Sequence, residues 1–138
     1  MSMVDRFRNF LVSKDLYANE GSFDNGEVYF TWEQTMENGG RVLLVANFSP
    51  DENFVDLKVL GIAKITNPLK RENFLSLINE LNSDYRFTKF YEANGEISAT
   101  YSMYINDDHT PEEIIDTLIM IYRSCTDNYP KFMRLVWS

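Results

Sequence analysis

The sequence predicts a single α+β domain in which a mainly antiparallel sheet packs against helices. Three observations support this prediction. Segments with helical spacing of apolar residues stand near the start, the middle and the end of the chain. Segments with alternating apolar and polar residues lie between them, joined by short glycine-containing turns. The 138 residues suit one domain, and no linker divides them. We expect the order α-βββ-α-ββ-α over residues 1–138.

The first predicted element is an amphipathic helix. Its apolar residues between positions 4 and 11 fall on one stripe, and charged residues face away. The pattern fades over residues 14–17. Residues 19–26 are rich in Gly, Asn and Asp, so we expect a loop there.

Three strands are predicted next, at residues 27–33, 41–48 and 54–65. The first and third alternate, whereas the second is apolar at nearly every position. Asn38-Gly39-Gly40 between the first two strands is typical of a tight hairpin turn. Gly61 interrupts the alternation of the third strand and predicts a bulge or a close backbone approach.

A helix followed by a hairpin is predicted in the middle of the chain. Asn67 is a good N-cap, Pro68 suits the first helical position, and residues 74–81 carry an apolar helical stripe. Residues 85–92 and 96–105 then form a predicted hairpin around Asn94-Gly95, because Asn-Gly supplies the positive φ angles of a two-residue turn.

The last predicted helix has the clearest start. Thr110 and Glu113 form a capping box, in which the threonine hydroxyl accepts from the glutamate amide. Residues 114–125 carry an apolar stripe. We expect residues 127–137 to form a separate short helix containing Pro130.

The charge and composition argue against several classes of function. The formal net charge is −8, from 21 acidic and 13 basic residues, and no basic run occurs, so we expect no nucleic-acid binding. An acidic surface that recruits a basic partner stays open. No signal peptide or membrane-spanning stretch is seen, and Cys125 is the only cysteine. We therefore expect a cytoplasmic protein without disulfides.

The sequence contains no recognisable catalytic or cofactor motif. His109 beside Asp107 and Asp108 could act as a general base or a metal ligand, but a polar turn before a helix cap explains the same residues. Cys125 lies late on an apolar helical stripe, where a thiolate is disfavoured. The acidic segment 51–56 lacks the spacing of ligand residues that a calcium-binding loop requires. We predict no catalytic, cofactor or metal site.

Large apolar side chains are more numerous than one core of this size needs. The chain holds 2 Trp, 8 Tyr, 10 Phe and 6 Met, and these residue types are enriched at protein interfaces. The alternative is that they fill the core. The candidates for exposure are Trp32, Tyr29, Tyr104, Phe132, Met133 and Trp137, and for any single one of them burial in the core is the favoured interpretation.

Several segments between residues 54 and 135 resemble the YbjN family, whose members are described as bacterial sensory-transduction regulators. They are the Leu- and Asn-rich helix at 74–82, the hairpin KFYEANGEI at 89–97, the capped helix at 110–124 and the Asp-Asn-Tyr-Pro sequence at 127–130. The family's fold resembles that of the dimeric chaperones of type III secretion systems. The resemblance implies an α+β protein-binding module that can form a homodimer, and it carries no catalytic residue.

These observations lead to two hypotheses about function. The first is a non-enzymatic protein-binding module, regulatory or chaperone-like, that holds an unidentified protein partner or client. The alternative is a small-molecule-binding protein or an enzyme with a site near His109, Asp107 and Asp108.

Overall fold

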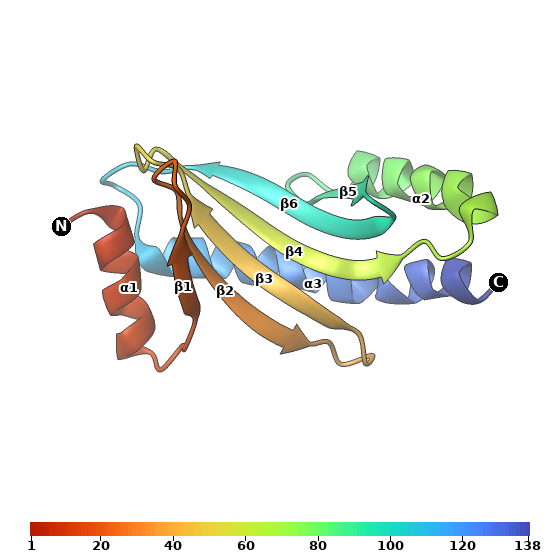
Figure 1. The fold of residues 1–138 in the computed structure, drawn as a ribbon, viewed down its shortest axis with the longest axis horizontal. Coiled ribbons are helices and arrows are strands. Elements are labelled where there is room, and N and C mark those ends of the chain that lie inside the picture. The colour runs from red at the N-terminus through yellow and green to blue at the C-terminus, as the bar shows by residue number, and fades with distance from the viewer.

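The computed structural model describes residues 1–138 and shows three α-helices and one six-stranded antiparallel sheet (Figure 1). The predicted α+β fold and the order of its elements are confirmed, with one short strand added. The elements are α1 (Met3–Ser13), β1 (Asn19–Ser22), β2 (Val28–Thr35), β3 (Arg41–Phe48), β4 (Phe54–Lys64), a 3-10 turn (Pro68–Lys70), α2 (Arg71–Asp84), β5 (Lys89–Ala93), β6 (Glu96–Tyr104) and α3 (Pro111–Trp137).

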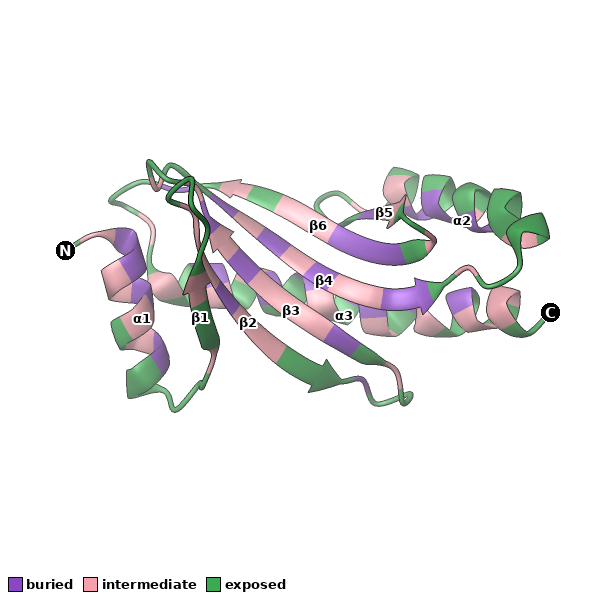
Figure 2. Cartoon of the chain, viewed as in Figure 1, coloured by how far each residue is buried: buried purple, intermediate pink, exposed green.

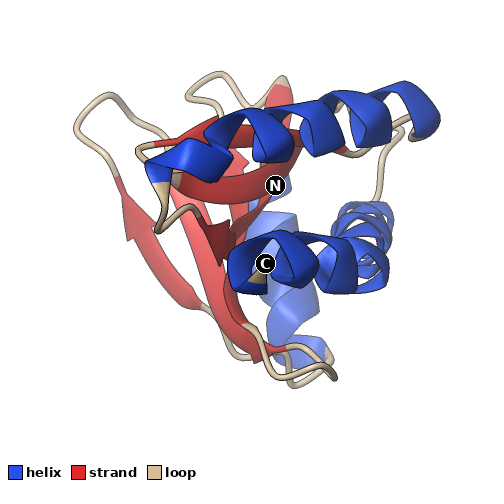
Figure 3. Cartoon of the chain, turned by 90° about the vertical axis from the view of Figure 1, so that its right-hand side faces the viewer, coloured by secondary structure: helices blue, strands red, loops and turns tan.

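The sheet has the strand order β1-β2-β3-β4-β6-β5, so β1 and β5 are its edges. Helices α1 and α3 lie on one face of the sheet, and α3 runs along it (Figures 1 and 3). Helix α2 lies beside β5 and packs on the C-terminal half of α3. The opposite face of the four central strands has no helix over it, and the two termini lie at opposite ends of the molecule.

The core lies between the sheet and the helices. Burial alternates along the strands, which is visible as bands of colour in Figure 2. Phe7 of α1 is fully buried and meets the rings of Phe30 and Phe48 edge to face, with centroids 5.0 and 5.2 Å apart. Phe74 of α2 stacks on Phe132 of α3 at 6.5 Å. These aromatic contacts fix the helices on the sheet, because buried rings contribute large apolar areas.

The predicted turns and caps are present. Asn94 and Gly95 both have positive φ, 54° and 81°, as a two-residue hairpin turn requires. Gly61, at φ 81°, lies where the register between β4 and β6 shifts, which confirms the bulge. The Thr110 hydroxyl accepts from the Glu113 amide at 3.2 Å, as expected for the cap of α3.

Three segments were predicted wrongly. The strand expected at 85–92 begins only at Lys89. Residues 19–26 contain β1, which pairs with β2 although its sequence, Asn-Glu-Gly-Ser, has no apolar side chain. The separate helix at 127–137 does not exist, because α3 continues through Pro130. An exposed proline removes one hydrogen bond from the helix, and the packing of residues such as Phe132 compensates for that loss.

Candidate functional site

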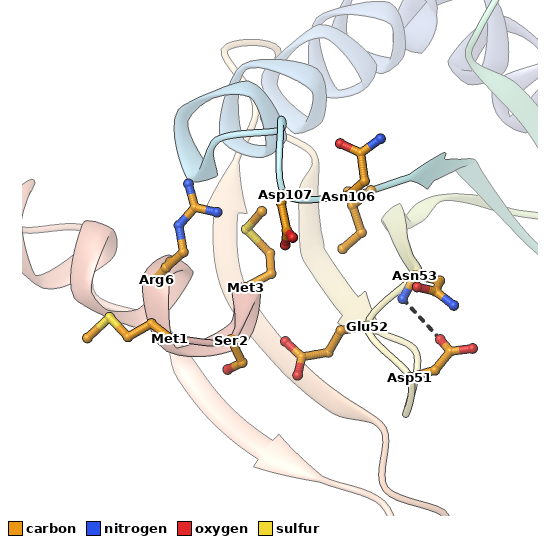
Figure 4. A pocket seen from close by; sticks show the side chains of 10 residues that line it. Met1, Ser2, Met3, Arg6, Asp51, Glu52, Asn53, Asn106 and Asp107 are labelled. Carbon is orange, nitrogen blue, oxygen red and sulfur yellow. Dashed lines mark hydrogen bonds between the residues drawn. The ribbon is translucent and has the colours of Figure 1, made fainter.

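A polar pocket of about 300 Å³ opens at the end of the molecule where α1 begins (Figure 4). It lies between the start of α1, the loop from β3 to β4 and the loop from β6 to α3. Three carboxylates and one guanidinium line it, so it is the place where acid–base chemistry would be sought. Its lining residues are Met1, Ser2, Met3, Arg6, Asp51, Glu52, Asn53, Ile105, Asn106 and Asp107.

Most polar atoms of this pocket stabilise local backbone. Glu52 accepts from the Val4 amide at 2.8 Å, which places a carboxylate at the N-terminus of α1. Asp51 accepts from the Asn53 amide, and this bond is the largest cause of its lowered pKa. Arg6 donates to the His109 carbonyl oxygen at 3.3 Å. These groups hold the loops and the helix end together.

The three residues of the alternative hypothesis do not converge in this pocket. Only Asp107 lines it. The Nδ1 atom of His109 lies 3.0 Å from the Asn106 amide nitrogen, and Asn106 Oδ1 accepts from the Asp108 amide. Both interactions belong to the turn before α3. The structure also contains no cluster of three or more His, Cys, Asp or Glu side chains that could hold a metal ion.

A second cavity, on the helix side of the sheet, is apolar. This groove has a volume of about 220 Å³ and lies over β2 and β3, between the turn after α1 and the first turns of α3. Six of its seven lining residues are hydrophobic. We call this cavity the apolar groove; it is lined by Leu16, Trp32, Gln34, Leu44, Ile115, Leu118 and Ile119.

The end of α1 places Leu16 at the groove. Asp15 takes the left-handed conformation at φ 56°, and the Leu16 amide donates back to the Leu11 carbonyl oxygen at 2.9 Å. This is the Schellman motif that commonly ends helices. As a result Leu16 stays 38% exposed, and Tyr17 beside it is 84% exposed.

Helix α3 supplies the other wall. The stripe that contains Ile114 and Leu118 is buried against the sheet, whereas Ile115 is half-buried and Ile119 is 39% exposed. Trp32 forms the floor, with one side of its ring against Phe7 at 6.4 Å. The groove therefore presents apolar side chains next to a tryptophan ring that packs on the core.

A smaller pocket of about 130 Å³ adjoins the groove through Leu16. It lies between the end of α1 and strand β1, and six of its eight lining residues are hydrophobic. Val12, which is 71% exposed, and Tyr17 form its outer wall. The apolar side chains that line the two cavities together form a larger exposed apolar area than single scattered surface residues would.

The prediction of exposed aromatic residues was correct only in part. Tyr104 and Trp137 are exposed, at 58% and 78%. Trp32, Tyr29 and Met133 are half-buried, and Phe132 is fully buried. Phe132 belongs to the core instead of the surface because its ring packs between Phe74 and Phe90.

Sequence reasoning also missed three of the groove residues, Leu16, Ile115 and Ile119. The two isoleucines were noted only as widening the apolar stripe of the last predicted helix. The signal that could have identified them was the width of the apolar stripe, which exceeds what one buried face of a helix requires.

Cys125 is not available for chemistry. It is fully buried on α3, and burial raises the pKa of its thiol far above the ordinary value. Separately, none of the helices combines the length and the hydropathy that crossing a membrane requires.

Comparison with known protein families matches one family over residues 13–134. The chain belongs to the YbjN family. This YbjN match extends the sequence resemblance into the N-terminal half and covers all six strands of the sheet. The family carries the description "Putative bacterial sensory transduction regulator", which indicates a regulatory role and names no reaction, ligand or partner. No curated protein and no solved structure matches this YbjN chain.

Proposed function

We propose that this YbjN-family protein is a non-enzymatic, protein-binding regulator of the cytoplasm, and that it holds an apolar segment of a partner or client in the apolar groove. The observation that carries the proposal is the exposure of Leu16 and Ile119 above the Trp32 ring, where no part of the chain covers them. The family description supports the regulatory part of the proposal.

The groove has the features of a site for side-chain anchors. Covering the exposed parts of Leu16 and Ile119 would contribute about 1 kcal/mol each, judged from the transfer free energy of such side chains. Trp32 is held by Phe7, so little conformational entropy would be lost on binding. Tryptophan is also the residue type most enriched among interface hot spots.

Affinity capture with a matched pair of variants tests the proposal. Wild-type protein, Ile119→Glu and Leu75→Glu would each capture partners from the native lysate at low and high salt. Leu75 lies on α2, away from the groove, and is 39% exposed like Ile119, so the two variants add the same charge at equal exposure. Mass spectrometry would quantify the captured proteins.

We expect a stoichiometric partner that wild type and Leu75→Glu retain at high salt and that Ile119→Glu loses by at least about tenfold. A charge placed against an apolar segment must be desolvated, and about 1.4 kcal/mol corresponds to tenfold in affinity. A partner retained equally by all three proteins would refute the role of the groove. A wild-type bait that captures nothing would refute protein binding itself.

A further inference from the structure

The two edges of the sheet differ in how their backbone groups are used. An edge strand presents unpaired amides and carbonyls to which another chain can pair, and proteins usually protect such edges. In this structure β5 is one edge and β1 is the other. Only one of them is protected.

The edge of β5 is closed by α2. A two-residue turn joins β5 to β6, so the residues that flank it, Ala93 and Glu96, form a hydrogen-bonded pair. Bonded and non-bonded pairs alternate along the strands, and the amides of Phe90 and Glu92 therefore point away from β6. The Asn82 side chain accepts from the Phe90 amide at 2.7 Å and donates to the Phe90 carbonyl oxygen at 3.0 Å. Arg71 forms an ion pair with Glu92. The outward backbone groups of Glu92 make no hydrogen bond to α2, so the helix bonds one of the two outward-facing residues and covers the rest of the edge by lying beside it.

The edge of β1 has no such cover. The Phe23 amide donates to the Glu27 carbonyl oxygen at 2.9 Å, and the register then makes Gly21 and Tyr29 the next hydrogen-bonded pair. The amides and carbonyls of Glu20 and Ser22 consequently face away from β2. No side chain is hydrogen-bonded to these four backbone groups, and β1 contains neither lysine nor proline.

The surroundings of β1 indicate what would pair with it. The small pocket beside β1 includes Glu20 itself and joins the apolar groove through Leu16. An added strand would direct alternate side chains toward this pocket, because side chains in a strand alternate between faces. The chain carries a net charge of −8, and acidic Asp24 and Glu27 follow β1 directly, so charge complementarity favours a basic segment over a second acidic copy.

We propose that a segment of a protein partner adds to the sheet as a further strand beside β1. This segment has alternating apolar residues and flanking Lys or Arg. Its backbone pairs, antiparallel or parallel, with the outward groups of Glu20 and Ser22. This inference rests on the proposed function and adds the conformation and chemistry of the bound segment. Backbone hydrogen bonds supply affinity in such pairing, and the pocket supplies selectivity.

Selection of short displayed peptides on the wild-type protein provides the probe. We expect the recovered peptides to alternate apolar residues and to carry Lys or Arg. Ser22→Pro removes the outward amide and leaves the bonds between β1 and β2 intact, because proline is tolerated on the free side of an edge strand. The dissociation constant should rise about tenfold or more with Ser22→Pro and stay unchanged with Ser22→Ala.

A second measurement does not depend on the folding of a variant. Methylating alternate backbone amides of a recovered peptide blocks one of its two hydrogen-bonding edges. One methylation pattern should abolish binding to the wild-type protein, and the complementary pattern should retain it. Equal binding of both methylated peptides would overturn the proposal.

The two proposals fail in different ways. Some peptides could lose affinity for Ile119→Glu yet bind Ser22→Pro normally and tolerate either methylation pattern. That result would support the groove as the binding site and overturn strand addition. Peptides that respond to the β1 tests but not to Ile119→Glu would retain strand addition and refute the groove as a shared site. Recovery of no peptide would overturn the inference about β1.

Discussion

Asn82 shows how much one side chain contributes to this fold. It uses its amide oxygen and its amide nitrogen to satisfy both outward groups of Phe90, and the main chain of Asn82 accepts from Lys89 Nζ at 2.8 Å. A buried or half-buried backbone group left without a partner costs free energy comparable to a lost hydrogen bond. Residue 82 therefore links α2 to the edge of the sheet.

We expect Asn82→Ala to lower the free energy of unfolding by about 1–3 kcal/mol, since it removes two hydrogen bonds of about 0.5–1.5 kcal/mol each. Urea denaturation followed by circular dichroism would measure the change. Asn79→Ala is the control, because Asn79 lies on the exposed side of the same helix and its side chain makes no hydrogen bond. Equal losses in both variants would show that the bonds to Phe90 are unimportant.

At the level of elements, α3 is a single helix of 27 residues that contains a proline. Pro130 has no amide hydrogen, so the carbonyl oxygen of Thr126, four residues earlier, lacks its helical donor. Neighbouring side chains reinforce this part of the helix: the Asn128 side chain donates to the Ser124 carbonyl oxygen at 2.8 Å and to the Tyr85 hydroxyl at 2.8 Å. Packing keeps the two halves continuous.

Replacing this proline should stabilise the protein. Pro130→Ala restores the missing donor, and we expect the free energy of unfolding to rise by about 1 kcal/mol or more, less than the full helix-propensity difference because the native backbone is already adapted to proline. Thermal and urea denaturation would measure it, with the exposed neighbour Lys131→Ala as the control. A destabilised Pro130→Ala would mean that the proline imposes a backbone shape on which the packing of α3 depends.

The turn between β5 and β6, strand β1 and helix α3 show which elements can be predicted from the sequence and which cannot. The Asn94-Gly95 turn and the Thr110 cap were predicted because their residues determine local backbone geometry. Strand β1 was missed because its four residues are polar or glycine, and only pairing with β2 makes them a strand. The break before Pro130 was wrong because a local rule was overridden by tertiary packing.

The candidate site depends on tertiary placement even more strongly. His109, Asp107 and Asp108 were grouped because they are adjacent in the chain, but in the structure only Asp107 lines the polar pocket, and His109 is bonded to Asn106 within the turn. Ile119 was seen only as part of a wide apolar stripe, and its exposure of 39% shows that the stripe extends beyond the face that packs on the sheet.

At the scale of the whole molecule, electrostatics predicts the response to acid. Arg8 bonds Glu20 through two nitrogens, at 2.6 and 2.7 Å, and thereby joins α1 to β1. This hydrogen bonding is the largest cause that lowers the pKa of Glu20 below its ordinary value of 4.5. Because the pKa is lower in the folded state, the stabilising contribution is complete above about 4.5 and disappears as the pH falls through the folded pKa.

We expect Glu20→Gln to flatten part of this pH dependence. At about pH 6 the variant should be less stable than wild type by under about 1 kcal/mol, since the pair is partly exposed and screened by solvent. At about pH 3 the difference should shrink, because below about 4.5 the carboxylate of the unfolded wild-type chain is protonated and the lowered pKa of the folded state no longer gives its full contribution. Urea denaturation of both proteins at the two pH values measures it. A difference that grows on acidification would contradict the assignment.

The unequal edges of the sheet also set a limit on self-association. Edge-to-edge pairing of sheets resembles a condensation polymerisation, in which the length of the product depends on how many reactive ends each unit has. With β5 covered by α2 and β1 open, each molecule has a functionality of one. Such a unit can cap a strand or complete a pair, but it cannot propagate a filament, because propagation needs two free edges. Loss of the Asn82 side chain alone would leave α2 beside β5, so the functionality would stay at one for as long as the helix remains packed there.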